Sequence, residues 1–248
     1  MKNYRKKIYK YYANASGYDL APSTVQGFNQ REPFFKYIIN EHFPKEKNIN
    51  ILEIGCGHGA FGYFIQKHGY KNYVGVNGSA SQVIEAQRLN VENIKNVDLV
   101  EYLKKTQSNS IDLLSAIDVI EHFNKTELSD LADEFYRILS ANGSIITHQP
   151  NGASPFVGAI RYGDFTHELA FTHTSMSQIF LSSKFSSVRS YEDSPIVHGL
   201  KSTIRLFLWN FLVKPIYKFF LVVEAGGVEK NIILSKNFLS VIRKNEHE

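Results

Sequence analysis

The sequence predicts a doubly wound α/β fold, in which helices cover both faces of a mostly parallel sheet. Short apolar runs alternate with helical patterns between residues 50 and 148, and a glycine-rich turn follows the first run. Gly69 supplies a stop signal after the first helix of this series. With 248 residues, of which 43% are hydrophobic, the chain has the size of one large domain with an appendage.

The strands and helices are expected in a regular order. Strands are expected at 50–54, 73–76, near 97, 111–116 and 144–148, and helices at 60–68, 79–89 and 125–139. Residues 1–48 are expected to form an N-terminal helical cap, in which Pro33 starts a helix, and the main domain then spans 49–248. A helix near 175–183, a strand near 188 and closing strands at 232–234 and 238–242 complete the expected elements.

The net charge of +4 comes from one short segment of the chain. Five basic residues fall within the first ten positions: Lys2, Arg5, Lys6, Lys7 and Lys10. The rest of the chain carries 23 basic and 24 acidic residues, which argues against a basic face for nucleic acid. No apolar stretch typical of a secretory signal follows these charges, and the single cysteine excludes a disulfide framework. A cytoplasmic protein is therefore expected.

The glycine turn fits two different cofactor motifs. Residues 57–62 spell G-x-G-x-x-G, the fingerprint of nicotinamide dinucleotide sites. Residues 53–59 spell an acidic residue followed by three alternating glycines. Both kinds of site place a ribose-binding side chain about twenty residues later, and here that residue is Asn77, which lacks the usual charge.

The run from Glu53 to Gly59 resembles motif I of the class I S-adenosylmethionine-dependent methyltransferases. The resemblance covers roughly residues 45–150, and includes SIDLLSAIDVIEHF and EFYRILSANGSIITHQPN in the family's order. It implies a Rossmann-like fold with a seven-stranded sheet, S-adenosylmethionine as donor and S-adenosylhomocysteine as product. The donor-binding residues implied are Glu53, Gly55, Cys56, Gly57, Gly59, Asn77, Asp98, Leu99 and Asp118.

Four further side chains are expected beside the transferred methyl group, at the carboxyl ends of the fourth and fifth strands. These candidate catalytic residues are Asp118, Glu121, His122 and His148. A neutral hydroxyl acceptor would need a base such as a histidine, whereas an anionic acceptor oxygen would not. The alternative for Glu121 and His122 is a solvated pair that caps a helix.

A long polar and aromatic loop at 150–174 is expected to bind the acceptor. The runs RYGDFTHELAFTHTSMSQIF and VHGLKSTIR resemble methyltransferases associated with bacterial capsule and other surface-glycan synthesis. The acceptor residues implied are Asn151, Arg161, Tyr162, Asp164, His167, His198, Lys201 and Arg205. The basic residues among them suit a phosphate-bearing acceptor, although solvated positions are the alternative. No metal is expected, because His167 and His173 lack a third ligand at a recognisable spacing.

An apolar segment at 204–223 is interrupted by Lys214, Pro215 and Lys218. Pro215 is expected to break it into two helices. Residues 196–223 contain four basic and no acidic residues, so the segment could lie on the inner membrane as a peripheral contact around Trp209. The favoured interpretation is a helical insertion at about 200–225 that packs in the core or forms a homodimer.

The main hypothesis is an O-methyltransferase that acts on a capsular or surface-polysaccharide precursor, at a sugar hydroxyl or a phosphoramidate oxygen. The chain lacks the N/D-P-P-Y sequence that some amine methylases carry after the fourth strand, which favours oxygen as the acceptor atom. Two alternatives remain open at this point. One is a nicotinamide-dependent oxidoreductase of nucleotide sugars, and the other is a non-catalytic, membrane-docked scaffold that binds the donor.

Overall fold

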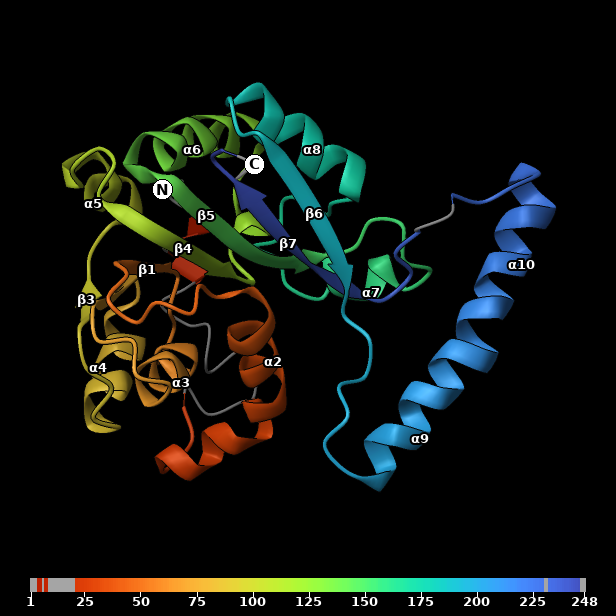
Figure 1. The fold of residues 1–248 in the computed structure, drawn as a ribbon, viewed down its shortest axis with the longest axis horizontal. Coiled ribbons are helices and arrows are strands. Elements are labelled where there is room, and N and C mark those ends of the chain that lie inside the picture. The colour runs from red at the N-terminus through yellow and green to blue at the C-terminus, as the bar shows by residue number, and fades with distance from the viewer. Residues whose placement is uncertain (1–3, 6, 9–20, 230–231, 246–248) are drawn as a thin grey trace.

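Seven strands form one mixed sheet in the computed structural model, which describes residues 4–5, 7–8, 21–229 and 232–245. The strands are β1 (Ile51–Ile54), β2 (Tyr73–Asn77), β3 (Ile94–Asn96), β4 (Ile111–Ile117), β5 (Leu139–Pro150), β6 (Ser187–Glu192) and β7 (Asn237–Arg243). Their order across the sheet is β3-β2-β1-β4-β5-β7-β6 (Figure 1). The first five are parallel, and β7 runs antiparallel to both β5 and β6. The predicted doubly wound, seven-stranded fold is confirmed.

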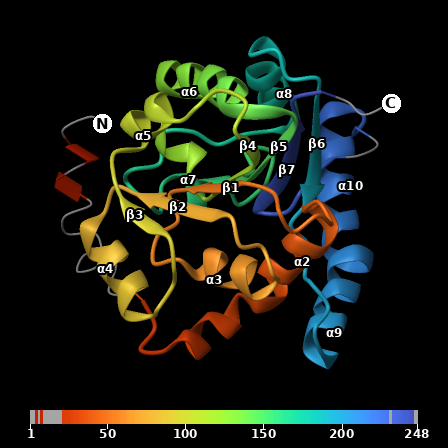
Figure 2. The ribbon, with the colours of Figure 1, turned by 60° about the vertical axis from the view of Figure 1, so that its left-hand side comes forward.

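Helices cover both faces of this sheet (Figures 1 and 2). One face carries α2 (Glu32–His42), α3 (Ala60–Lys67) and α4 (Ala80–Arg88), and the other carries α5 (Leu99–Lys105), α6 (Lys125–Ile138) and α8 (His173–Ser182). Each face has its own apolar core. Phe35 and Phe61 lie in the first core, whereas Phe135 and Phe180 lie in the second, and all four are at most 2% exposed.

Capping side chains explain where several helices begin. Asn124 and Glu127 form a capping box at the start of α6, and Thr172 does the same with Ser175 for α8. The carboxylate of Asp98 accepts hydrogen bonds from the first turn of α5. No helix was expected at 99–105, and the strand expected near Val97 ends one residue earlier, at Asn96.

Two predictions for the closing strands need correction. β5 begins at Leu139 instead of Ser144, because Leu139 already pairs with Ile111 before the register shifts. The strand expected at 232–234 is absent from the described residues there, and the backbone N–H of Leu234 donates to the side chain of Glu192. β7 alone closes the sheet after residue 231.

The long loop after β5 contains a short helix, α7 (Val157–Arg161). Beyond it, Phe171 returns to form an isolated bridge with Asn151, so the loop is tied back to the end of β5. α8 then begins at His173, which ends the loop slightly earlier than predicted.

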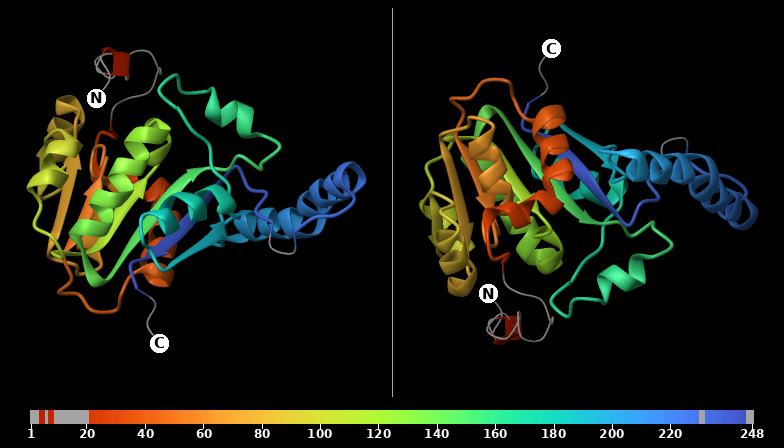
Figure 3. Two further views of the ribbon diagram at one scale, coloured as in Figure 1. Left: turned by 90° about the horizontal axis from the view of Figure 1, so that it is seen from above. Right: turned by 90° about the horizontal axis from the view of Figure 1, so that it is seen from below.

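The C-terminal apolar segment is one helical run, formed by α9 (Leu200–Leu208), a π-helical turn (Trp209–Val213) and α10 (Lys214–Ala225). It stands away from the sheet in several views (Figures 1 and 3). Pro215 falls at the start of α10 directly after the wide π-helical turn, so the predicted break does not occur.

The exposure of this helix overturns the expectation that it packs in the core. Phe211, Phe219 and Phe220 are each more than 60% exposed, and no buried residue other than Ser202 belongs to it. Within the described part of the chain, Leu200–Ala225 is the one helix whose length and apolar composition would suffice to cross a membrane.

Candidate functional site

The glycine turn between β1 and α3 has the backbone geometry that only glycine adopts readily. Gly55, Gly57 and Gly59 have φ angles of +65°, +57° and +81°. A Cβ atom on Gly55 would lie 2.5 Å from Val119, and one on Gly59 would lie 2.9 Å from Val91. A Cβ on Gly57 would meet only the Gln82 side chain, at 4.0 Å. Gly57 therefore borders open space, which is what a turn that cradles a ligand requires.

Two buried groups lie beneath this turn. Glu53 accepts a hydrogen bond of 2.5 Å from the hydroxyl of Tyr73. Burial raises the pKa of Glu53 to about 8, although the bond from Tyr73 works in the opposite direction. Burial, together with Glu53, also raises the pKa of the Cys56 thiol, so Cys56 stays protonated and acts as a packing residue instead of a nucleophile.

The remaining predicted donor residues lie at the ends of β2 and β3. The amide of Asn77 donates to the carbonyl of Gly57 at 3.1 Å and to Gln82 at 2.7 Å, so it faces the turn. Asp98 caps α5, and Leu99, the first residue of that helix, packs against the core. The fold thus brings these residues to the edge that carries the glycine turn, while their contacts with a donor stay a prediction.

Described residues that precede β1 also lie against this turn. The 3-10 helix η1 (Val25–Gln30) places the ring of Phe28 against His58, with ring centroids 5.5 Å apart. Arg88 of α4 donates to the carbonyls of Pro22 and Ser23, which holds the start of this segment in place. The predicted cap residues Lys2, Lys6 and Lys10 lie outside the described residues.

His148 is held between two carboxylates at the carboxyl end of β5. Its Nδ1 lies 2.5 Å from Asp118 Oδ1, and its Nε2 lies 3.4 Å from Asp193 Oδ2. Burial by itself would lower the pKa of His148, but Asp118 and Asp193 outweigh it and raise the pKa to about 10. The imidazole is therefore charged at neutral pH and has no lone pair with which to take a proton from an acceptor.

Asp118, one of the two partners of His148, has a pKa that is shifted in the opposite direction. Partial burial would raise the pKa of Asp118, yet His148 and then Arg31 lower it. Because the pKa of His148 is raised on folding, its contribution to stability is fully present below about pH 6.5 and is lost as the pH rises towards 10. The pKa of Asp118 is lowered on folding, so its contribution to stability is lost in acid, as the pH falls below the ordinary pKa of the carboxyl group.

A cavity of about 550 Å³ opens beside His148. Its polar lining includes Gln30, Arg31, Asp118, His148, Asp193, His198, Arg205, Trp209, Ser235, Lys236 and Asn237. The predicted acceptor residues His198 and Arg205 therefore meet the predicted catalytic residues Asp118 and His148, whereas Lys201 does not line the cavity. The sequence interpretation missed Arg31, Asp193 and Lys236 in this role.

Most predicted acceptor residues of the long loop hold the loop itself. The amide of Asn151 donates to the carbonyls of Ile233 and Ser235, and the guanidinium of Arg161 donates to those of His167 and Glu168. Asp164 accepts hydrogen bonds from Thr166, and Tyr162 is 80% exposed. None of the four lines this cavity, and their contact with an acceptor stays a prediction.

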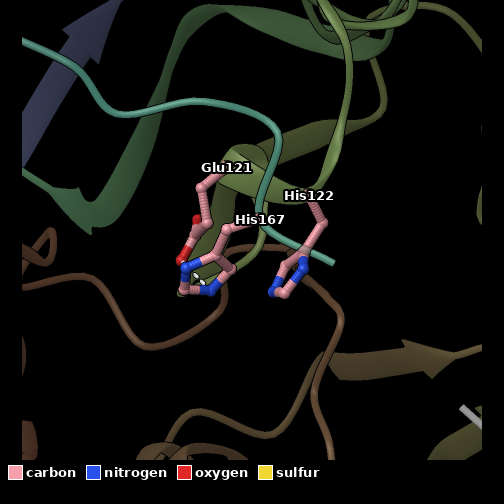
Figure 4. Close-up of side chains that lie close together, drawn as sticks. All are labelled: Glu121, His122 and His167. Carbon is pink, nitrogen blue, oxygen red and sulfur yellow. Dashed lines mark ion pairs between the residues drawn. The ribbon is translucent and has the colours of Figure 1, made fainter. Parts of the chain in front are cut away.

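A second cluster joins Glu121, His122 and His167 (Figure 4). Glu121 is only 1% exposed, so the alternative of a solvated capping pair fails for this residue. Its Oε1 lies 3.9 Å from Nε2 of His167. Burial, followed by the charge of Asp118, raises the pKa of Glu121 well above its ordinary value. Burial and the neighbouring His167 lower the pKa of His122 to about 4.

Arg5 lies next to this cluster and is buried. Its guanidinium forms ion pairs with Glu127 at 2.9 Å and with Glu168 at 3.3 Å, and Tyr4 also donates to Glu168. This member of the basic N-terminal segment is thus an internal link between α6 and the long loop.

The raised pKa of Glu53 predicts an unusual effect of pH. Its folded pKa of about 8 exceeds its ordinary value of 4.5, so its burial costs nothing in acid and costs more stability as the pH rises from 4.5 to 8. We expect Glu53→Gln to raise the free energy of unfolding by roughly 2–4 kcal/mol at pH 8, with little gain at pH 4.5. Urea unfolding without any ligand measures this, with the exposed Glu92→Gln as control. A loss of stability at pH 8 would contradict the assignment.

Comparisons with known proteins agree with this geometry. Residues 52–145 match the model of a family described as a methyltransferase domain. The mitochondrial ubiquinone biosynthesis O-methyltransferase of Dictyostelium discoideum is 26% identical over 169 residues, which cover 62% of this chain and 50% of that protein. The match thus spans about half the length of this curated relative.

Solved structures show the same fold at low sequence identity. A SAM-dependent methyltransferase from Archaeoglobus fulgidus has a TM-score of 0.63 at 16% identity, with 98% of this chain and all of that chain covered. The geranyl diphosphate C-methyltransferase of Streptomyces coelicolor has a TM-score of 0.59 at 13% identity, with 98% of each chain covered.

These matches decide between the two cofactor motifs of the glycine turn. The family model begins within β1 and includes the turn, and it describes a methyltransferase domain instead of a nicotinamide-dependent oxidoreductase. Residues 52–145 are therefore similar to a methyltransferase domain, and the chain as a whole has the class I fold of SAM-dependent methyltransferases of known structure.

Proposed function

We propose that this protein transfers the methyl group of S-adenosylmethionine to an oxygen atom of an anionic, phosphate-bearing small molecule. The observation that carries the proposal is the cavity beside His148, which lies at the carboxyl edge of the sheet and is rich in cations. The acceptor we favour is a precursor of a bacterial surface polysaccharide, because the two runs of residues that resemble capsule methyltransferases include His198 and Arg205 of this cavity.

The charges of the cavity support an anionic acceptor. Arg31, Arg205, Lys236 and the charged His148 supply four cations, whereas Asp118 and Asp193 supply two carboxylates that His148 already engages. A guanidinium matches two phosphate oxygens at once, so Arg205 is suited to grip a phosphate or phosphoramidate group.

The state of His148 bears on which oxygen is methylated. A charged imidazole cannot act as a general base, so the cavity suits an acceptor oxygen that is already anionic, such as that of a phosphoramidate, better than a neutral sugar hydroxyl. When bound, S-adenosylmethionine supplies an electrophilic methyl group, and the protein contributes mainly by alignment. The curated relative is also an O-methyltransferase.

Alanine substitutions at two glycines of the turn are expected to separate an effect on donor binding from an effect on stability. Alanine at Gly57 or Gly59 adopts the same unfavourable positive φ, at a cost of about 1–2 kcal/mol. Only Gly59→Ala also collides with Val91, so it should destabilise the fold more. Gly57→Ala places its methyl in the open space and should weaken S-adenosylmethionine binding at least tenfold.

Calorimetric titration with S-adenosylmethionine, together with thermal unfolding of both variants, measures these effects. Unchanged donor affinity in Gly57→Ala would count against the turn as the donor site.

The acceptor proposal predicts turnover with phosphate-bearing substrates. S-adenosylhomocysteine release should be highest with nucleotide sugars, sugar phosphates or a phosphoramidate nucleotide, and low with uncharged sugars. Arg205→Gln should raise KM about tenfold or more with little change in kcat, because the contact is the same in the ground and transition states. Lys201→Gln, one turn of helix away but outside the cavity, is the matched control.

Two outcomes would overturn parts of this proposal. If the protein methylates a hydroxylated quinone and no phosphate-bearing acceptor, the substrate is a quinone instead of a glycan precursor. Donor binding without turnover on any acceptor would favour the non-catalytic scaffold.

The exposed helix supports a further part of the proposal, namely peripheral contact with the cytoplasmic side of the inner membrane. Large apolar side chains cover its length, and its charges up to Val223 are basic. Arg205 and Trp209 belong both to this helix and to the cavity wall, so an acceptor held at a membrane would be close to the site.

We expect the protein to co-sediment with vesicles that contain anionic lipid. The double substitution Phe211→Asp with Phe220→Asp should abolish this binding, whereas Ile84→Asp, on α4 and equally exposed, should not. If the wild type remains in the supernatant and elutes as a dimer that the double substitution dissociates, the helix is a dimer interface instead.

A further inference from the structure

The cluster of Glu121, His122 and His167 has the composition and the geometry of a metal site. Two imidazoles and one carboxylate each offer one ligand atom, and these atoms all lie within 4.8 Å of one another. Bonds of about 2.0–2.2 Å to a metal allow ligand atoms to be up to about 4.4 Å apart, so closure needs shifts of only a few tenths of an ångström. Figure 4 shows the three side chains projecting to the same side of the chain.

The hydrogen bonds around the histidines fix which ring nitrogen carries the lone pair. The hydroxyl of Thr166 donates to Asp164, so its oxygen accepts from Nδ1–H of His122. Nδ1 of His167 lies 3.0 Å from the carbonyl of Ile160 and must be protonated to donate to it. Both rings are thereby held as the tautomer with the lone pair on Nε2. Metal-binding histidines show the same arrangement, because an outer partner orients the ring.

Glu121 supplies the second, independent observation. Its Oε2 is buried and has no hydrogen-bond partner among the described residues. An unpartnered carboxylate oxygen in such a place is costly for the fold, and a bound cation would satisfy it.

The backbone around the cluster is already fixed in the geometry that brings the ligands together. The amides of Glu168 and Leu169 both donate to the carbonyl of Glu121, at 2.8 and 3.0 Å. Arg161 holds the carbonyls of His167 and Glu168 from the other side. The long loop is thus attached directly to η2 (Ile120–His122), and little ordering remains to be done when an ion binds.

We propose that Glu121, His122 and His167 bind one divalent transition-metal ion, such as Zn²⁺ or Mn²⁺, and leave open positions for an oxygen of the acceptor. The two imidazoles suit Zn²⁺ best, and the carboxylate of Glu121 also suits Mn²⁺, whereas Mg²⁺ and Ca²⁺ prefer oxygen donors throughout. Three protein ligands with open positions are typical of catalytic metal sites, whereas structural sites are closed by four.

The role of the ion rests on the methyl transfer proposed above, whereas the metal site itself does not. An acceptor hydroxyl bound to the ion would have a lowered pKa and release its proton to water. The oxygen then forms a bond with the methyl carbon, and the C–S bond breaks with its electron pair left on sulfur. The charged His148 cannot activate a neutral hydroxyl, but the ion would. A sugar hydroxyl would then be a possible acceptor in addition to the anionic oxygens named above.

Calorimetric titration of the chelator-treated protein with Zn²⁺, repeated with Mn²⁺ followed by its electron paramagnetic resonance, tests the site. We expect one ion per chain, with affinity reduced roughly a hundredfold in Glu121→Gln and in His167→Ala. Thr166→Val removes the partner of His122 and should weaken binding about tenfold. His173→Ala is the matched control, because His173 is an exposed histidine six residues from His167 that contacts Ser190 instead of the cluster.

The control variant and the spectra decide between the outcomes. Circular dichroism and thermal unfolding of each variant establish that lost binding is not lost folding. Absence of stoichiometric binding by the wild type, or equal loss in His173→Ala, would overturn the site. Metal binding that leaves methyl transfer unchanged would overturn only the catalytic role. Metal binding without transfer to any acceptor would instead count against the proposed function.

Discussion

The whole site depends on the ion pairs of the buried His148 with Asp118 and Asp193. They join three separate parts of the chain, namely the end of β4, the end of β5 and the segment after β6. The backbone reinforces the link, because the N–H of Asp118 donates to the carbonyl of His148 at 2.9 Å. A charge buried in this way is tolerated only when its hydrogen bonds are satisfied, and here both ring nitrogens have a carboxylate partner.

Both functional regions extend from this pair. On one side, the positive φ of Asp118 turns the chain into η2, which presents Glu121 and His122. On the other side, Asp193 leads into the segment that carries His198 and Arg205 to the cavity. The ion pairs of His148 therefore connect the cavity wall with the strand end that leads to the Glu121 cluster, and a direct catalytic role of His148 stays a prediction.

The parts of the fold that were predicted correctly depend on local patterns. Apolar strands and capped helices have periods that are visible in a short window, and the order of the strands puts Asp118 and His148 near the carboxyl ends of β4 and β5. The contacts that the sequence did not predict join residues through the folded chain. Arg161 has the chemistry of a phosphate ligand, yet its partners are carbonyls of its own loop. His167 joins Glu121 across 46 residues, and no spacing rule in the sequence indicates that contact.

Some of the missed residues did leave a signal. Adjacent acidic and imidazole side chains shortly after β4, as in Glu121-His122, were a reason to search the following loop for a third ligand. Arg31 comes two residues before Pro33, which was expected to start a helix, so its place at the start of α2 could be anticipated. The exposure of Leu200–Ala225 left no such signal, because an apolar helix has the same composition in a core, at a dimer interface or on a lipid surface.

The burial of Arg5 has a practical consequence for work with this protein. Its side chain inserts between Glu127 and Glu168, and Glu168 is the neighbour of His167 in the loop. A fusion tag or trimming that displaces the first few residues would remove the Arg5 guanidinium from between the carboxylates of Glu127 and Glu168. The two carboxylates would then repel each other, and the effect would reach a loop more than 160 residues away in the sequence. Assays on tagged or shortened protein would then report on an altered site, although the altered residues are remote in sequence.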